Sequence, residues 1–177
     1  RMLYQVTDKP KYKQAMENIE GYFKSVWDSR SNTFYQGAHY INGQWIPNDS
    51  NFAVDCQTWA IDVLGAEKID SWFGEGAAYR MWQETKQLAG YFSNGRLLGV
   101  GYTNEHDQIS VEWTAGAILG LKNLAISYKD THPDWANVCI KEAQDMRALF
   151  ETLKKKSDGK AAYPYSLKRE FIPFGWW

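Results

Sequence analysis

Two carboxylates stand where a helix is expected to begin and where most neighbours are apolar. Asp55 lies within residues 51–59, and Glu112 lies within residues 110–116. Hydrolysis of a glycosidic bond commonly uses such a pair, with one carboxyl protonated to donate to the leaving oxygen and the other ionised as base or nucleophile. Asp55 and Glu112 are therefore the candidate catalytic pair. A carboxylate in a first helical turn also interacts favourably with the helix dipole, so a purely structural role stays open.

The sequence leaves the protonation of these two carboxyls open. A helix N-terminus favours the ionised form, whereas burial among aromatic side chains favours the protonated one. Two other acidic residues are weaker candidates. Glu75 stands between two glycines and is expected to support the start of a helix, and Glu170 is expected to be an exposed charge in a long connection.

Aromatic residues make up 16% of the chain, with nine Trp and eleven Tyr. Their rings combine an apolar face with a polar edge, which suits a hydroxyl-rich ligand such as a sugar. Six of them lie on or beside the long connections and are candidate substrate-binding residues: Trp45, Tyr91, Tyr102, Trp113, Trp176 and Trp177. Each of these rings could instead pack one connection against another.

Other chemistries find little support in the sequence. The three histidines are spread over three connections, and neither an H-E-x-x-H motif nor a paired-cysteine spacing occurs, so we expect no metal. Phosphate-binding glycine motifs and a G-x-S-x-G elbow are also absent from the sequence, and we expect no cofactor. Cys56 and Cys139 are expected to be buried thiols, although spacing alone does not exclude a disulfide.

Composition and charge narrow the class of protein. Twenty Lys and Arg balance twenty-one Asp and Glu for a net charge of −1, which argues against a nucleic-acid partner. The 177 residues, 44% of them hydrophobic, suit one packed domain over residues 1–177. No apolar run approaches the roughly 20 residues of a membrane-spanning helix, so we expect no membrane partner.

Hydrophobic periodicity predicts the elements that must position the candidate site. Helices are expected at 11–27, 52–64, 66–88, 111–128 and 134–155. The stretches 52–64 and 111–128 are apolar nearly all round, which is typical of buried helices, while the other three are apolar on one face. Gly74 is expected to break the third stretch. Asn-Gly pairs at 42–43 and 94–95 predict short β-hairpins.

The two kinds of helix alternate along the chain, and a long connection precedes each apolar helix. This order predicts an inner layer of helices wrapped by an outer layer, with a repeat of about 50 residues. The long connections would then gather where the inner helices begin. A binding or catalytic site is expected at that end.

With this helix order, the chain resembles part of an (α/α) toroid of the six-hairpin glycosidase type. The residues that carry the resemblance are 51–59, 110–116 and 171–177. It implies an all-α fold of antiparallel helical hairpins in two layers, with short β-hairpins in the long connections. It also implies a glycoside hydrolase that acts on an oligo- or polysaccharide. A closed toroid has six hairpins and this chain supplies about half, which implies a partial ring and a fragment of a longer chain.

Other functions stay open beside this one. A non-catalytic glycan-binding or structural helical module is favoured by an incomplete ring, because half a cavity rarely excludes water. A helical scaffold for protein partners is a third possibility, although its connections are usually short. An exposed apolar edge is expected on the inner helices, open to self-association or to the rest of the ring. A glycan-acting protein would be secreted or periplasmic.

Overall fold

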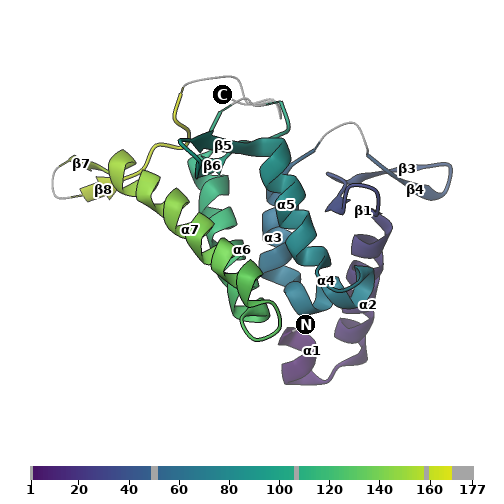
Figure 1. Cartoon of the computed structure of the whole chain (residues 1–177). Coiled ribbons are helices and arrows are strands. Elements are labelled where there is room, and N and C mark those ends of the chain that lie inside the picture. The colour runs from purple at the N-terminus through teal and green to yellow at the C-terminus, as the bar shows by residue number, and fades with distance from the viewer. Residues whose placement is uncertain (1, 49–51, 106–107, 158–159, 169–177) are drawn as a thin grey trace.

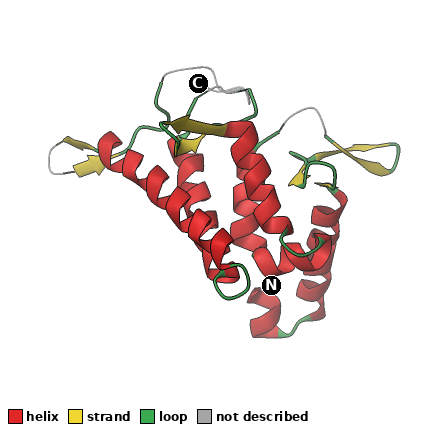
Figure 2. Ribbon diagram, viewed as in Figure 1, coloured by secondary structure: helices red, strands yellow, loops and turns green. Residues whose placement is uncertain are grey.

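The computed structural model describes residues 2–48, 52–105, 108–157 and 160–168. Within these ranges the chain forms helices joined by short β-hairpins (Figures 1 and 2). The helices are α1 (Met2–Thr7), α2 (Pro10–Ser25), α3 (Val54–Leu64), α4 (Ala66–Phe73), α5 (Ala77–Ala89), α6 (Val111–Tyr128) and α7 (Pro133–Leu153). The mainly helical class predicted from the sequence is confirmed, and α1 is an addition that the pattern did not predict.

The strands form four separate two-stranded antiparallel sheets within the described ranges. They are β1 (Trp27–Asp28) with β2 (Thr33–Phe34), β3 (Ala38–Ile41) with β4 (Gln44–Pro47), β5 (Gly90–Ser93) with β6 (Arg96–Val100), and β7 (Lys155–Ser157) with β8 (Lys160–Ala162). Figure 2 shows the strands at the ends of the helices rather than between them. The predicted β-hairpins in the long connections are thus confirmed.

Local sequence explains the turns and helix ends. Asn42 and Gly43 both have positive φ, at 51° and 83°, as do Asn94 and Gly95, at 50° and 73°. Two successive residues of this kind make the tight turn that matches the twist of a hairpin. The predicted break near Gly74 is also confirmed, because its φ of 96° ends α4 before α5 begins.

Helices α3 and α6 pack side by side and run in the same direction. Near their starts, a Cβ added to Gly116 would lie 2.9 Å from Nε1 of Trp59. Nearer their ends, the side-chain amide of Asn123 donates to Oδ1 of Asp62 at 2.9 Å. Because contacts advance along both helices together, the pair is parallel. Glycine at position 116 is what allows the Trp59 indole to lie against the α6 backbone.

The contact between Asp62 and Asn123 yields a stability prediction. Burial raises the pKa of Asp62 from its ordinary 3.8 to about 6, so ionised Asp62 destabilises the fold increasingly as pH rises through that range. We expect Asp62→Asn, which keeps an acceptor for Asn123, to raise the free energy of unfolding at pH 8 by about 1 kcal/mol after allowance for solvent screening. At pH 3.5 the variant should match the wild type in urea unfolding. An equal effect at both pH values, or a similar gain from the control Asp130→Asn, would contradict this prediction.

Two further helices pack on α3 and α6. Helix α7 packs along α6, and α5 packs against α3 and α4. The indole of the buried Trp82 donates to Oε2 of Glu142 at 2.7 Å, and Lys86 lies 2.6 Å from the other oxygen of that carboxylate. These contacts join α5 to α7.

Helices α3 and α6 each hold a strand through a buried polar side chain in the same helical position. Gln57, three residues after the start of α3, accepts from the backbone N–H of Phe34 on β2 and donates to its carbonyl, both at 2.8 Å. Thr114, three residues after the start of α6, accepts from the N–H of Val100 on β6 at 3.0 Å and donates to its carbonyl at 3.3 Å. The two strands are not equivalent in the chain, because the hairpin of β3 and β4 lies between β2 and α3.

The described parts of the long connections meet at the end where α3 and α6 begin, as predicted. The backbone N–H of Val54 donates to the carbonyl of Tyr102 at 3.1 Å, so the second connection crosses the start of α3. The N–H of Val111 donates to the carbonyl of Tyr165 at 3.0 Å, so the third connection crosses the start of α6. In Figure 1 the hairpins accordingly lie in the upper half of the molecule.

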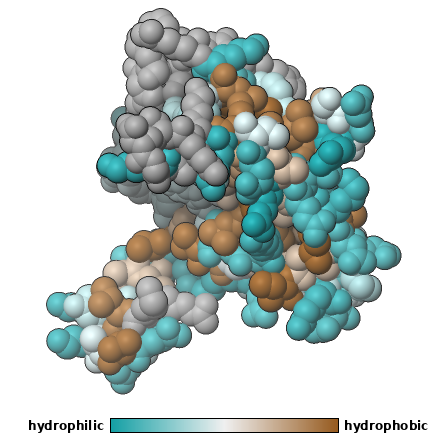
Figure 3. Space-filling model, turned by 90° about the vertical axis from the view of Figure 1, so that its left-hand side faces the viewer, coloured by the Kyte–Doolittle hydropathy of each residue, from teal (hydrophilic) through white to brown (hydrophobic). Residues whose placement is uncertain are grey.

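Helices α3 and α6 are only partly enclosed by their neighbours. The prediction that both would be almost completely buried was therefore wrong. Helix α2, which was expected to cover α3, has no buried residue. Trp59 and Val63 on α3 are 47% and 76% exposed, and Leu119 and Ile126 on α6 are 52% and 67% exposed. The expected exposed apolar edge is thus confirmed. Hydrophobic side chains also reach the surface as separate patches in the space-filling view (Figure 3).

Candidate functional site

Asp55 and Glu112 each occupy the second position of an inner helix. Because α3 and α6 are parallel, their first turns are neighbours at the same end of the molecule. The charge of Glu112 makes a minor contribution to the raised pKa of Asp55. The two acidic residues thus lie on neighbouring helix starts, and a shared catalytic site stays a prediction.

The surroundings of Asp55 favour its protonated form. Desolvation is the main cause that raises its pKa above the ordinary value, and the charge of Glu112 adds to it. Hydrogen bonding to Cys56, whose N–H donates to Oδ1 of Asp55 at 2.8 Å, opposes the rise without cancelling it. A half-buried carboxyl of this kind can hold a proton for transfer.

Glu112 is exposed and has an aromatic partner that the sequence did not reveal. Desolvation, together with the nearby Tyr102 and Glu112, raises the pKa of Tyr165 to about 12. Tyr165 therefore stays protonated at neutral pH and lies near the Glu112 carboxyl. Tyr165 and Glu112 are far apart in the sequence, so their proximity could not be predicted. It depends on the pairing of residue 165 with the start of α6.

Two predicted binding aromatics are buried near the starts of α3 and α6. Tyr102 is 0% and Trp113 is 7% exposed, and their rings meet edge to face with centroids 4.9 Å apart. The ring of Tyr165 lies 6.0 Å from that of Tyr102. Tyr102 and Trp113 thus pack near the starts of these two helices, and a direct contact with ligand stays a prediction for both.

The other predicted binding residues lie on strands or outside the described residues. Trp45 is 59% exposed on β4, in the hairpin that projects to one side in Figure 1. Tyr91 is half-buried on β5. Trp176 and Trp177 lie outside the described residues, as does Glu170.

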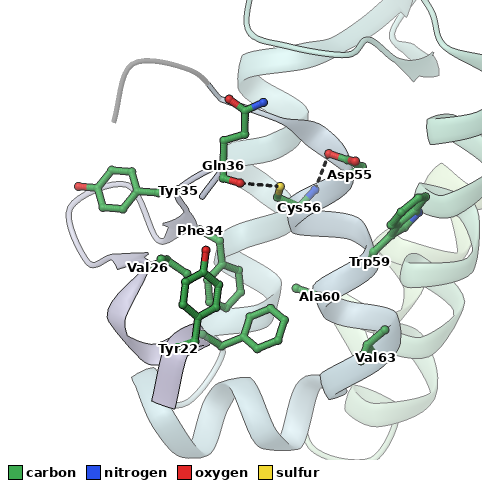
Figure 4. Close-up of a pocket in the computed structure, with 11 residues that line it drawn as sticks. Tyr22, Val26, Phe34, Tyr35, Gln36, Asp55, Cys56, Trp59, Ala60 and Val63 are labelled. Carbon is green, nitrogen blue, oxygen red and sulfur yellow. Dashed lines mark hydrogen bonds between the residues drawn. The ribbon is translucent and has the colours of Figure 1, made fainter. Parts of the chain in front are cut away.

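An apolar cavity of about 300 Å³ opens between α2, β2 and α3, with Asp55 among its lining residues (Figure 4). Trp59 lies on the same side of α3 as Asp55, and Tyr22 faces α3 from α2 (Figure 4). Tyr35 completes the aromatic part of the lining. The sequence gave no signal that Tyr22 or Tyr35 would line a site.

The described part of the chain brings together no group of three or more His, Cys, Asp or Glu side chains that could hold a metal ion. His39 is exposed on β3, and His106 lies outside the described residues. His132 stacks on Trp135 with centroids 3.9 Å apart and lies 3.3 Å from Glu75. Glu75 is therefore an exposed partner of His132, at the end of the molecule opposite Asp55.

The two cysteines have a structural role. Cys56 and Cys139 are free thiols, and burial raises the pKa of each to about 12, so neither is a nucleophile at neutral pH. Cys139 is fully buried as predicted, and Cys56 is half-buried.

Among the helices that the structure describes, none has the length and apolar character needed to cross a membrane.

Comparison with known proteins adds no relative: no family model, curated protein or solved structure matches the chain.

Proposed function

We propose that this chain is the catalytic part of a carbohydrate-active enzyme of the glycoside hydrolase class. One observation supports the proposal: α3 and α6 pack in parallel, and their first turns carry Asp55 and Glu112. Glycoside hydrolysis needs two carboxyls in different protonation states that flank one bond.

The surroundings of the two residues suggest their roles. Asp55, half-buried with a raised pKa, acts as the general acid that protonates the leaving oxygen. Glu112, exposed and close to the protonated Tyr165, acts as the base or nucleophile on the sugar.

We also propose that the helices form about half of an (α/α) toroid. In that arrangement α3 and α6 belong to the inner layer, and α5 and α7 to the outer layer. Support comes from the parallel packing of α3 and α6 and from Gln57 and Thr114, which each hold a strand from the same position of these helices. The exposed apolar edge of α3 and α6 would face the rest of the ring, or a second copy that takes its place.

A non-catalytic glycan-binding module is the second candidate. It is favoured by the apolar cavity beside Asp55 and by the exposed ring of Trp45, which could hold a sugar without cleaving it. Both candidates have a carbohydrate as ligand. Only the hydrolase requires the two carboxyls.

Release of reducing sugar from a panel of glycans tests the proposal. We expect release by the wild type and by the control Asp134→Asn, which alters the first-turn acid of the outer helix α7. The variant Glu112→Gln should release none, because an amide is neither a base nor a nucleophile at this position. Unchanged turnover by Glu112→Gln would remove Glu112 from the mechanism. A wild type that retains glycans without cleaving any of them would favour the binding module.

A further inference from the structure

The hairpin of β3 and β4, residues 38–47, exposes an unusual amount of apolar surface. Tyr40, Ile41, Trp45 and Ile46 are 63%, 48%, 59% and 45% exposed. Tyr40 and Trp45 are paired across the two strands, and their rings tilt against each other with centroids 5.1 Å apart. The hairpin, which we call the aromatic arm, stands away from the helices in Figure 1.

The aromatic arm carries no Asp, Glu, Lys or Arg in its ten residues, although 23% of the whole chain is charged. Its polar groups are the imidazole of His39 and the amides of Asn42 and Gln44, all of them exposed. Rings bordered by neutral hydrogen-bonding groups fit a ligand with apolar ring faces and many hydroxyls. A phosphate-, sulfate- or carboxylate-bearing polymer would find no cation on the arm to pair with.

Aromatic contacts connect the arm to the cavity beside Asp55. The ring of Trp45 meets that of Tyr22 edge to face, with centroids 6.1 Å apart. Tyr22 in turn lines the cavity, together with Tyr35 and Trp59 (Figure 4). Tyr22 thus joins the aromatic arm to the cavity that Asp55 also lines.

This aromatic track is almost free of charge. Among the described residues that line the cavity, Asp55 is the only charged one. The nearby Arg30 donates to the Tyr35 hydroxyl at 3.2 Å, but it is paired with Asp28 at 3.1 Å. The Arg30 guanidinium is therefore already paired with the Asp28 carboxylate.

We infer that the substrate is an uncharged, linear polysaccharide that binds along this track, from the aromatic arm past Tyr22 to Asp55. The inference rests on the proposed function and names the substrate class for the same site. A short oligosaccharide would occupy the cavity alone and would make no contact with the aromatic arm. A purely apolar partner would leave the polar groups of His39, Asn42 and Gln44 unmatched.

Affinity electrophoresis in gels that contain polysaccharide tests this inference. The neutral probes are mixed-linkage glucan, xylan, mannan and soluble starch, and the acidic probes are alginate and hyaluronan. We expect at least one neutral polymer, and neither acidic one, to retard the wild type. The variant Trp45→Ala should weaken that affinity about tenfold, an effect of the size expected for one aromatic contact. Trp45→Phe, which keeps a ring, should retain most of it.

A matched control is Phe92→Ala, which removes another exposed ring, 56% exposed on β5 and outside the track. It should bind as the wild type does. The inference is overturned if acidic polymers retard the protein as much as neutral ones, if no neutral polymer retards it, or if all three variants behave alike. Cleavage of short soluble oligosaccharides that is lost in Glu112→Gln would still support the hydrolase in those cases, so the two failures are distinguishable.

Discussion

Asp55→Asn is expected to lower turnover on a cleaved glycan at least a hundredfold while leaving the protein folded and at least as stable. Loss of a positioned general acid costs on the order of 10² to 10⁴ in rate. Asparagine is nearly isosteric with aspartate, so the cavity and the neighbouring Trp59 keep their shape. Turnover at several pH values and urea unfolding of the same samples measure the two effects.

The sign of the stability change follows from the raised pKa of Asp55. The folded protein holds the Asp55 proton more tightly than the unfolded chain does, so ionised Asp55 destabilises the fold increasingly as pH rises above its ordinary 3.8. Asparagine removes this cost. The variant should therefore unfold at equal or higher urea concentration at neutral pH, which distinguishes lost chemistry from lost structure.

The pH profile gives a second and independent readout. If Asp55 must be protonated, wild-type turnover falls on the alkaline side as the proton is lost, and Asp55→Asn lacks that limb. Substrates with an activated leaving group need little acid assistance, so the variant should recover part of its rate on an aryl glycoside. Turnover within threefold of the wild type, or an unchanged alkaline limb, would show that Asp55 is not the acid.

The sequence predicted the helices and tight turns because local physics determines them. Ser110 caps α6 by accepting from the N–H of Trp113 at 3.2 Å, and the Asn-Gly pairs turn the hairpins as expected. Alternation of one-faced and apolar helices also predicted where the connections gather. These features depend on residues close together in the chain.

Contacts between residues far apart in the chain could not be predicted from the sequence. Tyr165 reaches Glu112 only because the third connection crosses the start of α6, and Trp59 is exposed because α2 covers α3 incompletely. Periodicity records which residues are apolar, and it does not show how far a neighbouring helix extends. The pattern therefore could not distinguish an enclosed helix from one with an open apolar edge.

The residue that supports the start of α5 also could not be predicted from the sequence. Glu75, which precedes this helix, was expected to support its start, but Asp70 of α4 does so. Its Oδ2 accepts the N–H of Gly76 at 3.0 Å and its Oδ1 accepts that of Ala78 at 2.9 Å. The supporting residue lies in the previous helix because the left-handed Gly76, with φ of 75°, turns the chain back toward it.

Asp70→Ala is expected to reduce the free energy of unfolding by about 3 to 5 kcal/mol, a large part of the stability of a domain of this size. Besides the two N–H groups, Asp70 accepts the hydroxyl of Tyr128 at 2.6 Å. Alanine would leave the first turn of α5 and the buried phenol without acceptors. Helices α4, α5 and α6 would lose the side chain that joins all three.

A double-mutant cycle with Tyr128→Phe separates these contributions in urea unfolding. The phenylalanine variant removes the hydroxyl together with its need for an acceptor, so alone it should cost about 1 kcal/mol. In that background Asp70→Ala should cost less than in the wild type, by at least 0.5 kcal/mol as an order of magnitude for coupled neighbours. Additive effects, or a loss below about 1 kcal/mol for Asp70→Ala alone, would show that α5 begins without help from α4.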